Sequence, residues 1–168
     1  MTIRKATIQD VAGIAKVHVD SWRSTYDNII PEKYLMDLSY EQHEVKWEKI
    51  ISEGLAEVFI AEEDGKIVGF VSDRKDKDKR VLGAIYILDD YQGQGIGNAL
   101  MKEIFHYFSQ ENLEKVYVEV LADNTAKAFY EHYGAKYVGE EFITIGGKAL
   151  KEFIYVWDDV STVAKQLA

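Results

Sequence analysis

The stretch "LDDYQGQGIGNALMKEIF", from Leu88 to Phe105, contains the turn that decides the fold. Its three glycines, Gly93, Gly95 and Gly97, stand at alternate positions immediately before a run with helical apolar spacing. Glycine weakens regular structure, because it loses more conformational freedom on folding than other residues. We therefore infer that this turn brings its backbone close to something that side chains would keep away.

The turn also has the features of an anion-binding site. A helix that starts directly after a strand presents free backbone N–H groups and a partial positive charge. We expect the amides from Gln92 to Asn98 to form a cradle suited to phosphate. A dinucleotide-binding fingerprint would need glycine at Asn98, and a Walker loop would need lysine and a hydroxyl at Ala99 and Leu100. The sequence matches neither motif, which disfavours a nucleotide-binding switch domain.

The pattern of apolar runs and turns predicts an α/β fold. Two strand-like runs flank Asp64-Gly65, which predicts a hairpin, and "VLGAIYIL" after it is apolar enough for a central strand. The predicted order is β, helices, β, β, β, α, β, α, β, β. This order gives a mixed central sheet of about seven strands with helices on both faces.

Several local predictions accompany this order. We expect Asp10 to cap a first helix that runs to about Ser24, with Pro31 and Ser39 opening two further helices. The run "RKDKDKR", residues 74–80, is interpreted as an exposed hairpin loop.

Composition narrows the classes of function. The balance of 47% hydrophobic and 29% charged residues is typical of a globular domain. The chain has no cysteine, which excludes disulfides, thiolate metal sites and a cysteine nucleophile. It has no signal-like start and no apolar run of about 18 residues, so we expect a cytoplasmic protein with no membrane partner. His18 and His43 are too scattered to suggest a metal site.

The net charge of −9 disfavours nucleic acid as a partner and mildly favours a cationic one such as an amine. Solubility is the simpler explanation of the same charge.

The hexapeptide from Gln92 to Gly97 resembles the R/Q-x-x-G-x-G/A motif of the GNAT superfamily of acyl-CoA-dependent N-acetyltransferases. Farther along, "NTAKAFYEHYGAKYVGE" resembles the second block of that family, in which an Asn opens a helix and a Tyr lies near its end. The resemblance is strong over residues 83–139 and weak in the first 55 residues. It implies one N-acetyltransferase domain over residues 1–168. Its parts would be acceptor-side helices (1–56), an acyl-CoA-binding core (57–139), and a C-terminal hairpin and tail (140–168).

The resemblance also implies a cofactor site for acetyl-CoA as co-substrate, with no metal. The glycine turn would hold the CoA pyrophosphate, and the pantetheine arm would pair with the backbone of the central strand where it splays from "KVYVEVL". The implied cofactor-binding residues are Ile85, Tyr86, Ile87, Gln92, Gly93, Gln94, Gly95, Ile96, Gly97, Asn98, Asn124 and Lys127.

The implied reaction is transfer of acetyl from acetyl-CoA to a primary amine by direct attack in a ternary complex. Holding both substrates together supplies much of the acceleration without a covalent intermediate. Tyr130 matches the tyrosine that protonates the leaving thiolate, whereas Tyr133 is expected to pack.

The general base is left open. Many relatives carry a Glu on the strand that reads "VLGAIYIL" here, so Glu119, Asp73, ordered water and a backbone carbonyl are all candidates. The alternative function is a catalytically silent domain that binds acyl-CoA as a sensor.

The acceptor is expected to be a small-molecule or peptide amine. His18, Trp22 and Tyr26 share one helical face, which predicts either an aromatic wall for the acceptor or packing of the helix on the sheet. A similar W-x-x-x-Y before Pro occurs in some family members. Homodimers are common in the family, and we expect the strand at "EFIYVW" to be an exposed edge that supports one.

Overall fold

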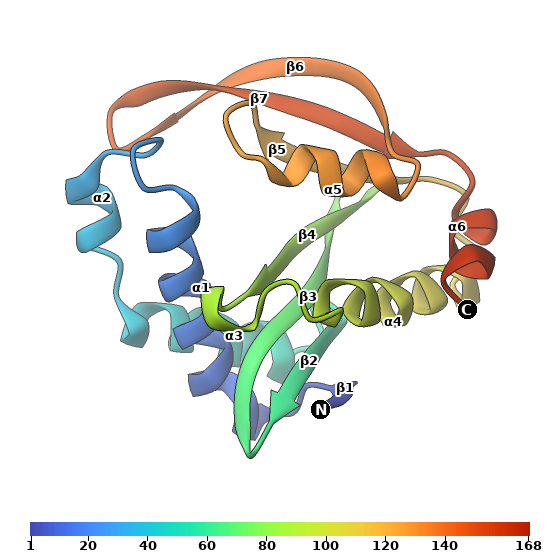
Figure 1. The fold of residues 1–168 in the computed structure, drawn as a ribbon, viewed down its shortest axis with the longest axis horizontal. Coiled ribbons are helices and arrows are strands. Elements are labelled where there is room, and N and C mark those ends of the chain that lie inside the picture. The colour runs from blue at the N-terminus through green and yellow to red at the C-terminus, as the bar shows by residue number, and fades with distance from the viewer.

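A seven-stranded mixed sheet runs through the computed structural model, which describes residues 1–168 (Figure 1). The strand order is β1-β2-β3-β4-β5-β7-β6, and only β4 and β5 are parallel neighbours. The strands are β1 (Thr2–Lys5), β2 (Val58–Glu63), β3 (Lys66–Asp76), β4 (Lys79–Ile87), β5 (Val116–Leu121), β6 (Lys136–Ile145) and β7 (Lys148–Trp157). The apolar strand β4 is central, and the fold is of the predicted α/β class.

Helices cover both faces of this sheet, as predicted. They are α1 (Val11–Thr25), α2 (Glu32–Met36), α3 (Tyr40–Ser52), α4 (Ile96–Gln110), α5 (Ala126–His132) and α6 (Val160–Leu167), with short 3-10 helices η1 (Ile8–Asp10) and η2 (Asp89–Tyr91). In Figure 1, α4 and α6 lie together at one end of the sheet, and α5 lies across β5. None of the helices combines the length and the apolar character that crossing a bilayer demands.

Two large apolar clusters explain this layering. On one face, Leu100, Ile104 and Phe108 of α4 are fully buried in a cluster with the sheet and with α5 and α6. Their spacing of four residues places them on one side of the helix. On the other face, Ile14 of α1 and Trp47 of α3 pack with residues of β2 and β3. Burial of such faces is the main favourable contribution to folding.

A third, smaller cluster joins the end of α1 and the α2 region to the far half of the sheet. Tyr26, Ile30 and Leu35 pack here with Leu121 of β5 and Leu150 of β7. The contact fixes Tyr26 beside the carboxyl end of β5, where the candidate site lies.

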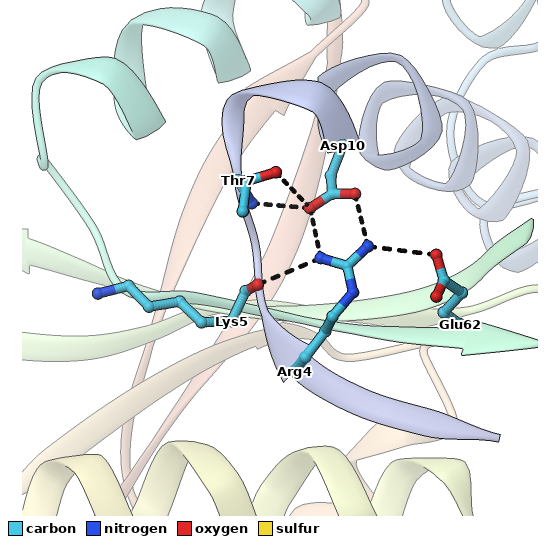
Figure 2. A network of polar contacts seen from close by, with 5 residues as sticks. All are labelled: Arg4, Lys5, Thr7, Asp10 and Glu62. Atoms are coloured by element: carbon cyan, nitrogen blue, oxygen red, sulfur yellow. Dashed lines mark hydrogen bonds and ion pairs between the residues drawn. The ribbon is translucent and has the colours of Figure 1, made fainter. Parts of the chain in front are cut away.

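The predicted cap of the first helix is wrong. The Asp10 carboxylate accepts a hydrogen bond from the Thr7 amide at 2.7 Å and ion-paired hydrogen bonds from Arg4 at 2.8 and 2.9 Å (Figure 2). Arg4 also bonds Glu62 at 3.2 Å. The hydrogen bond from Arg4 lowers the pKa of the Asp10 carboxyl below its ordinary value. Asp10 therefore ties the start of α1 to β1 and β2. It stands at the N-cap position of α1 without a side-chain cap bond, and its carboxylate completes a capping box with Thr7 at η1.

Two elements extend farther than the sequence indicates. Most of "RKDKDKR" continues β3 and β4, so the turn is only Lys77-Asp78, with Lys77 at a φ of 55°. The expected C-terminal tail contains α6, which Asp159 caps by accepting a hydrogen bond from the Thr162 amide at 3.2 Å. Val160 is fully buried against the α4 cluster, which explains why the helix forms there.

The strand that contains "EFIYVW" is not an exposed edge, contrary to the prediction. It is β7, which lies between β5 and β6. The long hairpin of β6 and β7 arches over one side of the molecule (Figure 1), and β6 forms the edge. After β5 the chain first forms β6 at the edge and then returns as β7 between β5 and β6. Local sequence patterns do not reveal this order.

Candidate active site

A cleft of about 820 Å³ opens where β4 and β5 diverge. The two strands pair only at Val81 and Tyr117, and they separate beyond that point. The splay lies where the sequence predicts it. The cleft is lined by β4 from Leu82 to Ile87, by the glycine turn, by the start of α5 and by Tyr26 of α1.

The glycine turn presents free backbone amides to this cleft. None of the amides from Gly93 to Asn98 donates a hydrogen bond within the protein. The amide of Gln92, which also lines the cleft, donates to the Asp89 carbonyl at 3.2 Å and is therefore not free in the same way. Free amides that precede a helix can receive an anion directly.

The three glycines serve two different purposes. Gly93 and Gly95 have φ angles of +75° and +83°, and a Cβ at either position would meet no protein atom within 4 Å. They permit the left-handed backbone and leave open space beside it. At Gly97 a Cβ would lie 3.4 Å from Ile87 and from the Phe129 ring. The third glycine therefore lets the start of α4 lie close to β4 and α5.

No cationic side chain lines the cleft. Its charged lining residues are Asp89, Glu119 and Asp123. A phosphate group in the cleft would therefore be bound by backbone amides and the positive end of α4. Lys127, an expected cofactor contact, donates to the Ala122 carbonyl at 2.9 Å, and its ammonium lies over the Phe153 ring. Neither Lys127 nor Gln94 is a lining residue.

Tyr130 brings a phenol hydroxyl to the cleft from α5. Its side chain is 8% exposed, and its hydroxyl makes no hydrogen bond within the protein. Burial raises the pKa of Tyr130 well above its ordinary value, and the nearby Tyr26 raises it further. The hydroxyl therefore keeps its proton at neutral pH.

Two neighbours organise the entrance to α5. The Asn124 amide oxygen accepts a hydrogen bond from the Ala126 amide at 2.9 Å, and its nitrogen donates to the Tyr26 hydroxyl at 3.5 Å. Tyr133 also lines the cleft, and its hydroxyl donates to the Asn98 side chain at 2.8 Å. Tyr133 packs as expected, with its ring centroid 5.0 Å from that of Phe129, and its hydroxyl also links the end of α5 to the first turn of α4.

The aromatic face of α1 is divided between packing and the cleft. Trp22 donates its indole N–H to the Tyr86 hydroxyl at 2.9 Å and does not line the cleft, whereas Tyr26 does. Burial raises the pKa of both tyrosines, Tyr26 and Tyr86. Of the two alternatives for this face, helix packing describes Trp22, whereas Tyr26 lines the cleft.

His18 and His43 are not scattered in space, contrary to the sequence-based interpretation. Their ring centroids lie 4.6 Å apart, and His18 Nδ1 accepts a hydrogen bond from the Trp47 indole at 3.1 Å. Burial lowers the pKa of His18 to about 3, so the ring is neutral inside an aromatic cluster.

The structure separates the two carboxylates considered as bases. Asp73 is buried, pairs with Arg80 at 3.0 Å and accepts a hydrogen bond from the Glu57 amide at 2.7 Å. It borders a different cavity of about 240 Å³. Desolvation raises the pKa of Asp73. Glu119 lines the cleft and pairs with Arg74.

Two more carboxylates, on Glu141 and Glu152, lie beside Glu119. Sequence reasoning missed them, because their proximity depends on the register of β5, β7 and β6. The only signal in the sequence was their location in the predicted final hairpin.

Comparisons with known proteins agree with this geometry. Residues 30–151 match the acetyltransferase (GNAT) domain family. The chain is 37% identical to an uncharacterized N-acetyltransferase, YuaI of Bacillus subtilis, over 97% of this chain and 96% of the relative. It is 26% identical to a spermidine N(1)-acetyltransferase of Thermoplasma acidophilum, over 80% and 87% of the two chains.

Among solved structures, the PaiA N-acetyltransferase of Thermoplasma acidophilum in complex with coenzyme A superposes with a TM-score of 0.77. The sequence identity is 23%, and the match covers 94% of this chain and 98% of that one. The chain therefore belongs to the GNAT superfamily of N-acetyltransferases, as its two motifs predict.

Proposed function

We propose that this protein transfers the acetyl group of acetyl-CoA to a primary amine by direct attack in a ternary complex. One observation carries the proposal. The free amides from Gly93 to Asn98 and the unpartnered Tyr130 hydroxyl meet in the same cleft between β4 and β5. One end of the cleft suits a diphosphate and the other suits a leaving group that needs a proton.

The residues present fit acetyl-CoA. The amides of the glycine turn would hold the pyrophosphate, and the β4 backbone from Ile85 to Ile87, which has no pairing to β5, would bond the amides of the pantetheine arm. When bound, acetyl-CoA supplies an acetyl group activated as a thioester. The related PaiA structure, in complex with coenzyme A, supports this assignment.

Tyr130 would donate a proton to the departing sulfur. A raised pKa keeps the phenol protonated until negative charge develops close by. The same water-poor surroundings raise the pKa of a thiol, since burial disfavours every anionic form. When burial shifts both groups alike, the transfer stays modestly uphill, as their solution values of about 10 and 8.5 imply.

The acceptor would enter beside Tyr26 and Glu119, which line the same cleft as the glycine turn. We infer a small-molecule or peptide amine. The similarity to a spermidine N(1)-acetyltransferase supports an aliphatic amine.

A catalytically silent acyl-CoA-binding domain is the second candidate, because β4 carries no carboxylate between Val81 and Ile87. Release of free thiol from acetyl-CoA, followed with a panel of primary amines, separates the two functions. We expect at least one amine to raise the rate about tenfold or more over hydrolysis. Tight binding of acetyl-CoA with no amine-dependent release would identify the silent domain.

A further inference from the structure

Three carboxylates from three strands converge beside the cleft, and one of them, Glu119, lines it. Glu119 of β5, Glu141 of β6 and Glu152 of β7 place oxygens that all lie within 4.8 Å of one another. Glu152 pairs with Glu141 on one side and with Leu121 on the other, and paired residues share a face of the sheet. Glu119 lies two residues before Leu121 on β5, so all three carboxylates are on that face. We call these three residues the carboxylate cluster.

The charge of the cluster is only partly compensated. Arg74 of β3 pairs with Glu119, and no other ion pair reaches the three carboxylates. The groups that face Glu152 are Glu119, Glu141, Arg74 and, from α1, the Tyr26 hydroxyl. Like charges held this close favour either a bound proton or a bound cation.

A second feature of the cleft points independently to a ligand at this place. Tyr130, buried and with no hydrogen-bond partner for its hydroxyl, lines the same cleft as Glu119. Tyr26 connects the two sides, because it interacts electrostatically with both Tyr130 and Glu152. A hydroxyl that has no protein partner and opens onto the cleft is available to a polar ligand, and the charged side chains that line this cleft are all acidic.

We propose that the carboxylate cluster receives the ammonium group of the acceptor and takes its proton, with Glu119 contacting the nitrogen and Glu152 holding the proton. The acceptor class is an aliphatic amine that is cationic at neutral pH. This inference rests on the proposed acetyl transfer and supplies the base that β4 lacks.

One proton leaves the ammonium nitrogen for the cluster, and the freed lone pair forms the bond to the acetyl carbon. The carbon–sulfur bond breaks, and the sulfur gains the proton of the Tyr130 hydroxyl. The nitrogen then loses its second proton to water, which leaves the neutral amide. The proton held by the cluster passes through water to the Tyr130 phenolate, so that both groups are restored for the next turnover.

The protonation behaviour of Glu152 is suited to this role. Desolvation, then the charge of Glu119 and the hydrogen bond to Glu141, raise its pKa to about 7. A base acts best when its pKa lies near the working pH.

The test compares the pH profiles of kcat/KM for butylamine in wild type, Glu152→Gln and Glu119→Gln. Glu140→Gln is the matched control. Glu140 directly precedes Glu141 on β6, points to the opposite face of the sheet and pairs with Lys151 at 3.5 Å. We expect kcat/KM of the wild type to rise as pH increases through about 7. In both cluster variants this rise should be absent, and kcat/KM should be lower by about tenfold or more. Glu140→Gln should behave as wild type.

A second measurement does not depend on turnover. Carbon-13 NMR of the glutamate carboxyls should show Glu152 titrating near neutral pH, with its midpoint moved down by butylamine and unmoved by butanol. A nearby cation favours the ionised carboxylate, and a neutral alcohol of the same length does not.

The outcomes separate this inference from the proposed function. If butylamine is acetylated and both cluster variants keep the wild-type profile, the cluster proposal is overturned while acetyl transfer stands. If no amine is acetylated but butylamine shifts the Glu152 titration, the proton-transfer role is overturned. Tight binding of Mn²⁺ at the cluster, with no effect of butylamine, would overturn the proposal in favour of a metal site.

Discussion

The two sides of the cleft differ in the chemical groups that they present, backbone amides on one side and side chains on the other. The glycine turn is made of one continuous segment, Gly93 to Asn98, and it offers backbone amides in a fixed conformation. The acceptor side that we propose is made of side chains: Tyr26 and Glu119 line the cleft, and Glu141 and Glu152 of β6 and β7 lie beside Glu119. Backbone dipoles recognise a group that every acyl-CoA shares, whereas side chains can change without disturbing the fold. The comparison explains how one scaffold keeps its cofactor and varies its acceptor.

The largest effect that we expect concerns the side-chain end. Tyr130→Phe should lower kcat by about 10² to 10⁴, because one positioned proton donor is removed. The affinity for CoA should stay within about twofold, since the glycine turn is intact. Steady-state kinetics and calorimetry on the same preparations measure both quantities.

Tyr133→Phe is the control for this change. It removes a hydroxyl from the same helix that bonds Asn98 at 2.8 Å. An equal loss of kcat in both variants would contradict the assignment of Tyr130 as the proton donor.

The next prediction tests whether Asp73 belongs to the site or to the scaffold. Asp73→Asn should lower the free energy of unfolding by about 2–3 kcal/mol, because it leaves the largely buried Arg80 without its charge partner. The value of kcat, measured below the unfolding transition, should be unchanged. If kcat falls and its pH dependence loses one of its titrations, Asp73 takes part in catalysis. That result would contradict the assignment of Asp73 to the scaffold and of Glu119 to the site.

The carboxylate cluster predicts a pH dependence of stability. The pKa of Glu152 is raised in the folded protein to about 7, so its stabilising contribution is present below the ordinary pKa of a glutamate and is lost as pH rises through about 7. Glu152→Gln should therefore be more stable than wild type at about pH 8, by about 1 kcal/mol once solvent screening of this half-buried group is allowed for.

Thermal unfolding of both proteins at about pH 5 and about pH 8 gives the comparison. The advantage of the variant should be absent at the lower pH. A constant difference at both values would show that Glu152 ionises like an exposed glutamate.

The smallest expected effect concerns salt. Because no cationic side chain lines the cleft and the chain carries a net charge of −9, CoA binding should not weaken as salt rises. Between about 0.05 and 0.5 M NaCl, we expect Kd to stay constant or fall by less than about threefold as repulsion is screened. A Kd that rises steeply with salt would show that lysine or arginine side chains bind the phosphates.

The backbone-built end could be predicted from the sequence because its signals are local. The glycine spacing, the apolar strand before it and the helical run after it occupy one segment, Leu82 to Phe105. The splay of β4 from β5 and the place of Tyr130 in the cleft were predicted from the resemblance of the same segments to a family.

The side-chain end could not be predicted, because it depends on pairing between distant strands. The order β5-β7-β6 decides that Glu152 lies beside Glu119, and no local pattern encodes that order. The same cause made the assignment of "EFIYVW" to an edge wrong. The cap at Asp10 failed for a related reason, since Arg4 from β1 competes for the carboxylate.

The most direct test of the account is calorimetric titration of CoA into wild type, Gly95→Asp and Gly65→Asp. Both variants place an aspartate where φ is positive, +83° and +77°, with open space around the new Cβ, and only Gly95 borders the cleft. We predict that Gly65→Asp keeps the wild-type affinity and that Gly95→Asp loses about a hundredfold or more, because its carboxylate enters the pyrophosphate cradle. Equal affinities in the two variants, or no binding by wild type, would contradict the assignment of the glycine turn as the acyl-CoA site.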